Sequence, residues 1–598
     1  MDRLHGRAVV KGFATGEVLY SETGLSFWGG VSPKSGIVVD RHHPLCGQHL
    51  NGKILAIPAG RGSCTGSQVI LELLLNGTSP AAIVCQADEI IALGAIVAEE
   101  LFDRRLPVVF LEEDAFQALS TWTTMTIDGN TLSREEACAT YDVQEEEDLQ
   151  LSTSDQQMLS GQKGLAQQKA LSIVARMAKL QGATSLVDVK QAHIDGCTYI
   201  GPASLQFAQK FLEWNAKVQV PTTLNAISVD LARKDEVPPE LGGPAASLAE
   251  AYLKMGAKGS FTCAPYLLDT APEQGDHIGW GESNAVVFAN SVLGARTQKY
   301  ADFLDACVAI TGRAPLAGCH LERAAQVVLE VKMDVSCIDD AFYPTLGYLC
   351  GLKSPRFIPA IVGLETLKPT RDDLKAFSAA FGTSSSAAMF HLVGLTPEAP
   401  DLQSVLKDED AEVIDLHGED LRNVWQDLDA DSSCGVVDLV ALGNPHFSLE
   451  EHGRMVELCD GRQKHPDVTV VITSGPEVIA QSRRLGFHAQ LQAFGAQLVS
   501  DTCWCMLGEV VPAPQSVVPP TSRTLITNSA KYAHYAPGLV NRQVRFGSLA
   551  TCIDAACNRV VSSNRPAWLG LQSRRSSTLA SGYKALSGLA GRLLRRAR

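Results

Sequence analysis

The sequence contains no run of about 18 apolar residues, the length that a membrane-spanning helix requires. Its beginning, MDRLHGRAVVKGFATGEV, also has no continuous apolar core of the kind found in secretory signal peptides. These two absences argue against membrane insertion and export. We therefore expect a protein without a membrane span that works in the cytoplasm, where cysteines stay reduced.

Positive charge is scarce as well. The 51 lysines and arginines are outnumbered by 66 acidic residues, which gives a net charge of −15. Nucleic acids and anionic membrane surfaces bind clusters of positive charge, so this balance argues against both as partners. A small polar ligand fits the composition better. The segment 562–598 stands out as basic, and we expect it to be a flexible tail without a catalytic role.

Common metal and nucleophile motifs are absent too. The 16 cysteines include no CxxC pair and no CxxC…HxxxH pattern, so spacing alone predicts no zinc site. In a reducing compartment we expect most of them to be small buried apolar residues, with a few metal ligands among them. The sequence GRGSC at 60–64 also differs from the GxSxG turn of serine hydrolases.

The sequence does contain short apolar strands that alternate with helices, and this alternation predicts an α/β protein. In the first part of the chain we expect strands at 53–60, 81–85 and 106–111 and a helix at 66–76. They form one compact α/β unit in this interpretation.

A later series of strands is typical of a doubly wound sheet. The strands are expected at 436–443, 468–475, 496–503 and 523–530. Ligands of such sheets gather beyond the carboxyl ends of the strands. The residues at these ends are Asn444, Pro445 and His446, Ser474, Thr502 and Cys503, and Asn528 and Ser529.

At 598 residues the chain exceeds what one core usually serves, so two or three domains are expected. The acidic run at 145–157 is either a solvated connector or the opening of the next helix. We place a small domain at 1–145, a large domain at 146–561 and the basic tail at 562–598.

The stretch GRGSCTGSQVILELLLNG at 60–77 leads from a strand through a glycine-rich turn into a helix. Ser63 is either the cap of that helix or a catalytic group, because the N-terminus of a helix also stabilises negative charge. Arg61 is either a clamp for a carboxylate or a surface cation. Spacing alone leaves both questions open.

Seven segments together resemble the aconitase X family and follow one another in the order of that family. They are GGVSPKSGIVVDRHHPLCGQHLNGKILAIPAGRGSCTGS, HIDGCTYIGPASLQF, VPTTLNAISVD, FTCAPYLL, WGESNAVVFANSVLGART, DTCWCM and TNSAKYAHYAPGLV. The resemblance implies a small swivelling domain, which is a separate subunit in some members, fused to a large aconitase-like catalytic domain. Members are hydro-lyases with an iron centre in the large domain.

The resemblance also implies roles for individual residues. Ser63 matches the serine that takes the substrate proton, and closure of the small domain over the large one assembles the site. The matching metal ligands are Cys263 and Cys503, to which we add Cys307. The iron is expected as an iron–sulfur cluster, with [2Fe–2S] as one form, or as a single ion.

Substrate contacts are expected by the same resemblance, because hydroxyl, amide and ammonium groups can hold a carboxylate and a hydroxyl. His193 is a further candidate, as a proton donor to the leaving hydroxyl, or else a structural residue. The expected substrate-binding residues are Arg61, Gly196, Cys197, Thr198, Thr222, Thr223, Ser283, Asn284 and Lys531.

One departure from the family pattern bears on the substrate. The branch acting on phosphomevalonate carries GCPH where this chain has Gly443, Asn444, Pro445 and His446. This favours the branch that dehydrates cis-3-hydroxy-L-proline to Δ1-pyrroline-2-carboxylate, with a serine base and iron as Lewis acid. The alternatives are dehydration of mevalonate 5-phosphate or of another small hydroxy acid, and a non-catalytic iron-binding protein. The sequence leaves the oligomeric state open.

Overall fold

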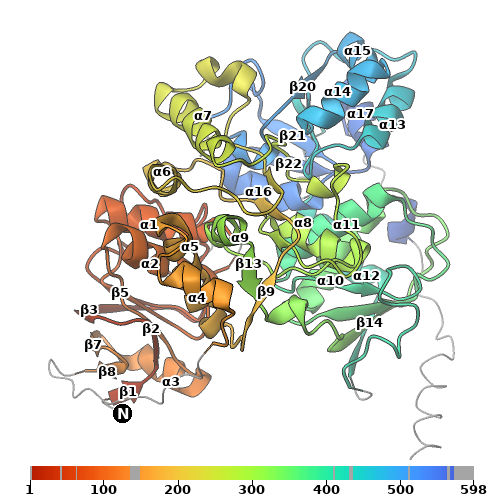
Figure 1. Ribbon diagram of the computed structural model, residues 1–598. Coiled ribbons are helices and arrows are strands. Elements are labelled where there is room, and N and C mark those ends of the chain that lie inside the picture. Colours follow the sequence, from red (N-terminus) through yellow and green to blue (C-terminus); the bar gives the residue numbers. More distant parts are fainter. Residues whose placement is uncertain are drawn as a thin grey trace, which may run out of the picture.

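The computed structural model describes residues 3–40, 43–61, 64–134, 149–408, 411–429, 435–508, 512–561 and 566–570. Four groups of helices and strands follow one another along the chain (Figure 1). We call them the N-terminal unit (3–134), the β10 unit (149–323), the β14 unit (325–429) and the β18 unit (435–561), the last three after a strand in each. The architecture is α/β, as the sequence predicts.

The N-terminal unit is built on a mixed sheet of eight strands in the order β1-β8-β7-β3-β4-β5-β6-β2, in which β3, β4, β5 and β6 are parallel. Alternate residues of its central strands face two different cores, as the two-residue period of a strand requires. Helices α1 and α2 pack on one face. The elements are β1 (Arg3–His5), β2 (Arg7–Val10), β3 (Phe13–Tyr20), β4 (Ile54–Ala56), α1 (Gly66–Asn76), β5 (Ala82–Cys85), α2 (Glu89–Phe102), β6 (Val108–Phe110), α3 (Glu113–Ala118), η1 (Leu119–Thr121), β7 (Thr124–Asp128) and β8 (Thr131–Ser133).

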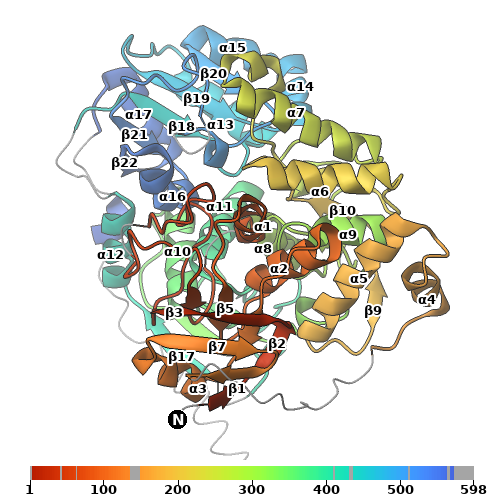
Figure 2. The same cartoon turned by 90° about the vertical axis from the view of Figure 1, so that its left-hand side faces the viewer.

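The β10 unit contains a parallel sheet in the order β11-β10-β12 and an antiparallel pair, β13 and β9. Its helices share one continuous apolar core with α1 and α2 of the N-terminal unit, and Figure 2 shows α1, α2, α5 and α6 side by side. The elements are α4 (Thr153–Leu159), α5 (Leu165–Leu180), β9 (Leu186–Asp188), β10 (Ala192–Ile194), α6 (Pro202–Glu213), β11 (Thr222–Leu224), η2 (Leu231–Glu236), α7 (Pro239–Lys254), η3 (Pro265–Leu267), β12 (Gly279–Trp280), α8 (Ser283–Phe288), η4 (Ala289–Leu293), α9 (Leu304–Thr311), β13 (Arg313–Pro315) and η5 (Gly318–His320).

The β14 unit is a four-stranded parallel sheet in the order β16-β15-β14-β17, and it shares a second apolar core with part of the β18 unit. Helices α10 and α11 make the most extensive helix pair of the molecule. The elements are β14 (Val327–Val331), α10 (Phe342–Lys353), β15 (Pro359–Val362), α11 (Arg371–Ser384), β16 (His391–Leu392), β17 (Glu412–Leu416) and α12 (Gly418–Leu428).

The β18 unit is the doubly wound sheet that the sequence predicts, with five parallel strands in the order β20-β19-β18-β21-β22. Its order reverses between β18 and β21, which creates a crevice at the carboxyl ends of the strands. The elements are β18 (Leu439–Leu442), α13 (Leu449–Cys459), β19 (Thr469–Thr473), α14 (Pro476–Arg484), α15 (Phe487–Phe494), β20 (Ala496–Val499), η6 (Trp504–Met506), β21 (Thr524–Thr527), α16 (Ala530–Val540), β22 (Gln543–Phe546) and α17 (Leu549–Asn558), and the short η7 (Ala567–Gly570) follows the unit.

Two domain ends expected from the sequence can be compared with the structure. The boundary placed between 145 and 146 falls in the segment 135–148, outside the described residues. The tail expected at 562–598 begins too early, because Trp568 is buried against Phe342 and Trp425 and its indole N–H donates to Asp339. The short η7 turn therefore belongs to the folded body.

No helix in the described part of the chain is long and apolar enough to cross a membrane.

Candidate active site

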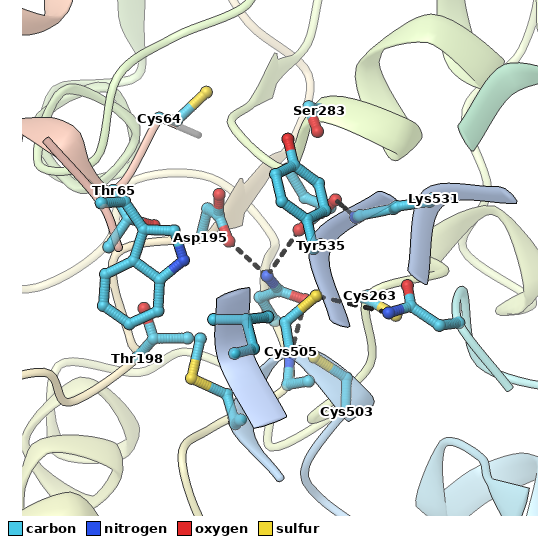
Figure 3. A pocket seen from close by; sticks show the side chains of 17 residues that line it. Cys64, Thr65, Asp195, Thr198, Cys263, Ser283, Cys503, Cys505, Lys531 and Tyr535 are labelled. Atoms are coloured by element: carbon cyan, nitrogen blue, oxygen red, sulfur yellow. Dashed lines mark hydrogen bonds and ion pairs between the residues drawn. The ribbon is translucent and has the colours of Figure 1, made fainter. Parts of the chain in front are cut away.

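A pocket lies where the N-terminal, β10 and β18 units meet (Figure 3). Each of these units contributes side chains to its wall. The lining residues are Trp28, Cys64 and Thr65 from the first, Asp195, Thr198, Asn225, Ala226, Cys263, Glu282 and Ser283 from the second, and Asn444, Cys503, Cys505, Met506, Lys531, Tyr535 and Leu539 from the third.

Sheet topology explains why polar groups of the β10 unit gather here. Its three strands are parallel, so their carboxyl ends lie along one edge. Asp195 follows β10, Asn225 follows β11 and Glu282 follows β12, within two residues of the strand end in each case. All three side chains are buried and line the pocket.

The β18 unit reaches the same pocket from its own carboxyl edge. Asn444 follows β18, and Cys503 and Cys505 lie in the turn beyond β20. Lys531 and Tyr535 stand one turn apart on α16, which begins just after β21. Two parallel sheets thus point their carboxyl edges at one cavity.

The N-terminal unit contributes the start of α1. Thr65 occupies the N-cap position of this helix. The Cys64 thiol donates to the carbonyl oxygen of Gly281 at 3.6 Å, across the boundary between the two units. Ser63 itself lies outside the described residues, but both residues that follow it line the pocket.

A buried ion pair dominates the electrostatics of the pocket. Lys531 Nζ lies 2.8 Å from Glu282 Oε1, and the Asn284 amide donates to the same oxygen at 2.7 Å. Burial raises the pKa of Glu282, but the charge and hydrogen bond of Lys531 together with the hydrogen bonds from Asn284 outweigh burial and lower this pKa to about 2. Burial lowers the pKa of Lys531, while Glu282 raises it well above its ordinary value. Both groups are therefore charged at neutral pH.

Three thiols lie in the wall opposite the N-terminal unit. The backbone N–H of His446 donates to the Cys263 sulfur at 3.3 Å, and the Asn444 amide donates to the Cys505 sulfur at 3.3 Å. A hydrogen bond from Cys503, aided by the charge of Lys531 and the Asn444 hydrogen bond, outweighs the effect of burial and lowers the pKa of Cys505 to about 7. The environment favours a thiolate at this position.

The structure brings five of the expected site residues to the pocket. They are Thr198, Cys263, Ser283, Cys503 and Lys531.

The other expected site residues lie elsewhere. Asn284 lies directly behind the wall, where it holds Glu282. Arg61 pairs with Asp40 at 2.6 Å and is half exposed. Cys307 is fully buried in α9 and is not among the residues that line the pocket.

The strand residues expected to bind substrate form hydrogen bonds within the sheet and the turn beside it. The Thr223 hydroxyl lies 2.8 Å from His193 Nδ1, and the Thr222 hydroxyl donates to Val220. The Gly196 N–H donates to Asp305, and the Cys197 thiol donates to backbone carbonyl oxygens. These residues hold β10, β11 and the turn after β10, while the residue beyond each strand faces the cavity.

Several pocket residues were missed from the sequence, Asp195, Asn225, Glu282 and Cys505 among them. Asp195 and Glu282 lie inside the segments HIDGCTY and WGESNA, Asn225 lies in VPTTLN, and Cys505 lies in DTCWCM. The signal that could have identified the first three is their place just beyond parallel strands. Cys505 stands two residues after Cys503, but only the fold shows that both line the same pocket.

Four family models match the chain in succession. Residues 3–134 match the aconitase X swivel domain, 148–323 the first domain, 325–426 the second domain and 437–558 the third domain.

Full-length relatives and a solved structure agree with these models. A cis-3-hydroxy-L-proline dehydratase of Pseudomonas aeruginosa is 56% identical and one of Hypocrea jecorina 47% identical, each over 94% of this chain and over 98% and 97% of their own lengths. The crystal structure of Thermococcus kodakaraensis aconitase X in its holo-form superposes with a TM-score of 0.60 at 31% identity, and covers 68% of this chain and 100% of the other. The chain belongs to the aconitase X family.

Proposed function

We propose that the protein is a hydro-lyase that dehydrates cis-3-hydroxy-L-proline to Δ1-pyrroline-2-carboxylate. The observation that carries this proposal is the near-complete match to two proteins named for that activity, which extends over all three units that line the pocket. The domain division at 1–145 and 146–561 is part of the proposal, since the swivel and first-domain models adjoin near this boundary.

The donors in the pocket fit an iron centre. Cys263, Cys503 and Cys505 are soft sulfur ligands that approach one cavity from two sheets, and N–H groups stabilise negative charge on two of them. Among the described residues no three potential ligands are already arranged as a metal site, so binding requires these side chains to turn toward a common point. We assign Cys505 as the third ligand in place of Cys307.

Iron bound there would supply a Lewis acid for departure of the substrate hydroxyl. The type of centre, [2Fe–2S] or another cluster or a single ion, is left to spectroscopy.

Ser63 is the proposed base for the Cα proton. It adjoins Cys64 and Thr65, which line the pocket at the N-terminus of α1. The dipole and free N–H groups of a helix N-terminus stabilise the alkoxide form of a serine, which is the form that takes a proton. A serine at this end of α1 can therefore be held as the alkoxide at less cost than in water.

The charged pair suits a small zwitterion. The Lys531 ammonium attracts the substrate carboxylate, and the Glu282 carboxylate attracts the ring ammonium. Lys531 is the one cation among the described lining residues, and it is already paired. A phosphate group would demand further positive charge, so the pocket favours hydroxyproline over mevalonate 5-phosphate.

The protein is proposed to act in the cytoplasm on a small-molecule substrate, without a nucleic-acid partner. Every cysteine in the described ranges is a free thiol, as a reducing compartment predicts.

The test compares two substrates with iron-loaded protein. We expect conversion of cis-3-hydroxy-L-proline, detected as Δ1-pyrroline-2-carboxylate, and no dehydration of mevalonate 5-phosphate. The opposite preference would establish the phosphomevalonate alternative, and iron binding without turnover of either compound would identify a non-catalytic protein.

A further inference from the structure

The dehydration proposed above needs a proton for the departing hydroxyl, and the pocket contains a carboxyl group that no step has used. Asp195 stands at the carboxyl end of β10 and is 6% exposed. Its carboxyl group accepts a hydrogen bond from the Asn225 amide, drawn as a dashed line in Figure 3. Asp195 therefore reaches the cavity from a fixed position.

Asp302 is fully buried, and its charge acts on Asp195. Asp302 Oδ1 is buried without a hydrogen-bond partner among the described residues. A hydrogen bond between the two carboxyl groups would satisfy this oxygen and requires a proton on one of them. Burial, together with the charge of its partner, raises the pKa of Asp195 well above its ordinary value. Burial likewise raises the pKa of Asp302 to about 7, aided by the charge of Asp305.

The neighbouring carboxyl groups hold this proton less strongly. Burial raises the pKa of Asp305 to about 6, but this carboxyl accepts four backbone N–H bonds, from Asp195, Gly196, Phe303 and Ala306, which favour its ionised form and keep its pKa below that of Asp302. Glu282 is held ionised by Lys531. The Asp195–Asp302 pair has only amide and hydroxyl partners, so the proton of this carboxyl cluster is held there.

Residues of the N-terminal unit hold Asp302 in position. Gln68, on α1, donates from Nε2 to Asp302 Oδ2 at 2.6 Å, and the Ser67 hydroxyl donates to the Asp302 carbonyl oxygen at 2.9 Å. The helix that starts beside Ser63 thus also fixes the carboxyl group behind Asp195. Packing of the N-terminal unit on the β10 unit would therefore position both the base and the Asp195–Asp302 pair.

We propose that Asp195 is the general acid of the dehydration, supplied by the proton that it shares with Asp302, and that Asp302 and Gln68 are positioning residues. The Cα–H bond breaks as the base takes the proton, and its electron pair forms the new double bond. The bond from C3 to oxygen breaks, and the leaving hydroxide takes the proton of Asp195 to become water. The proton held by the base returns to the carboxyl pair before the next turnover. This inference rests on the proposed function.

The test uses iron-loaded wild type, Asp195→Asn and the matched control Asp269→Asn, an exposed aspartate of the same unit. We expect Asp195→Asn to lose about 100-fold or more in kcat on cis-3-hydroxy-L-proline, with unchanged iron content. With cis-3-chloro-L-proline, whose chloride leaves without a proton, the variant is expected to stay within about fivefold of wild type. The control should match wild type on both.

A second readout detects the shared proton itself. Infrared spectra at neutral pH are expected to show a carboxylic-acid band that shifts in D2O and disappears in both Asp195→Asn and Asp302→Asn. Equal loss with both substrates, or full hydroxyproline turnover by Asp195→Asn, would overturn the assignment. If iron-loaded wild type converts neither compound, the proposed function fails first and the inference falls with it.

Discussion

At the scale of single residues, Glu282 and Lys531 show how a charged pair can be both structural and functional. Both side chains are about nine-tenths buried, and their opposite charges compensate in the wall of the pocket. Removal of one partner leaves an uncompensated buried charge, which is far more destabilising than loss of an exposed pair.

We expect Glu282→Gln to lower stability by about 3 kcal/mol, measured as a lower melting temperature. The matched control is Glu250→Gln, which removes an exposed pair with Lys254 and should leave the melting temperature unchanged. Because the folded pKa of Glu282 lies near 2, below its ordinary 4.5, the stabilisation is complete above pH 4.5 and is lost as the pH falls toward 2. Equal effects of the two variants would contradict the assignment.

The proton shared by Asp195 and Asp302 predicts a pH dependence of catalysis. The general acid must be protonated, so kcat of wild type is expected to fall only as the pH rises through the pKa of Asp195, which lies well above its ordinary value. In Asp195→Asn this fall should disappear along with most of the activity. The charged and titratable groups that face the pair are Asp305, Glu282, Cys64 and Cys197, with Lys299 near Cys64. A pH profile of the same shape in both proteins would count against the pair.

At the scale of elements, the turn after β20 decides the metal-ligand set. Cys503 and Cys505 lie in this turn beside Cys263, whereas Cys307 lies inside α9. The thiols of Cys503 and Cys505 lie on one turn and can move toward a common centre. The Cys307 side chain lies on a core helix, where its neighbours hold it in place.

We therefore expect Cys505→Ser to lose most of its bound iron and Cys307→Ser to retain it. Both substitutions exchange sulfur for oxygen, at the partly buried Cys505 and the buried Cys307, so each serves as the control for the other. Iron content and the visible absorption of the purified proteins measure the result. Retention by Cys505→Ser together with loss by Cys307→Ser would restore the ligand set expected from the sequence.

Elements with strong local patterns could be predicted from the sequence. The helix expected at 66–76 is α1, and the four strands of the later series are β18, β19, β20 and β21. Their apolar runs and flanking glycines are local signals. Trp568 could not be placed in this way, because its burial depends on Phe342 and Trp425, which are distant in the chain.

The candidate site was predicted only in part, for a related reason. Cys263, Cys503 and Lys531 lie in recognisable segments that the fold brings to the pocket. Thr222 and Thr223 lie in equally recognisable segments but are strand residues, and the sheet uses their hydroxyls. Which member of a motif faces a cavity depends on where the strand ends.

At the scale of the whole molecule, the N-terminal unit packs on the β10 unit as a subunit would. Helices α2 and α5 share an apolar core, and Arg176 contacts Glu99 at 2.9 Å and Glu100 at 3.2 Å across the interface. The resemblance to family members with a separate small subunit agrees with this arrangement.

We expect the chain to tolerate division within 135–148. The two separately purified pieces should associate and regain dehydratase activity in proportion to complex formed. Arg176→Glu should weaken association at least about tenfold, and the added changes Glu99→Arg and Glu100→Arg should restore part of it. Calorimetry measures the affinity, and activity without association would contradict a pocket built between units.

The most direct test of the account is turnover of cis-3-hydroxy-L-proline by wild type and Ser63→Ala, both loaded with equal iron. The account predicts Δ1-pyrroline-2-carboxylate from wild type and a loss of about 1000-fold or more in the variant, because only the base is removed. Substantial turnover by Ser63→Ala at the same iron content would contradict a site completed by the N-terminal unit.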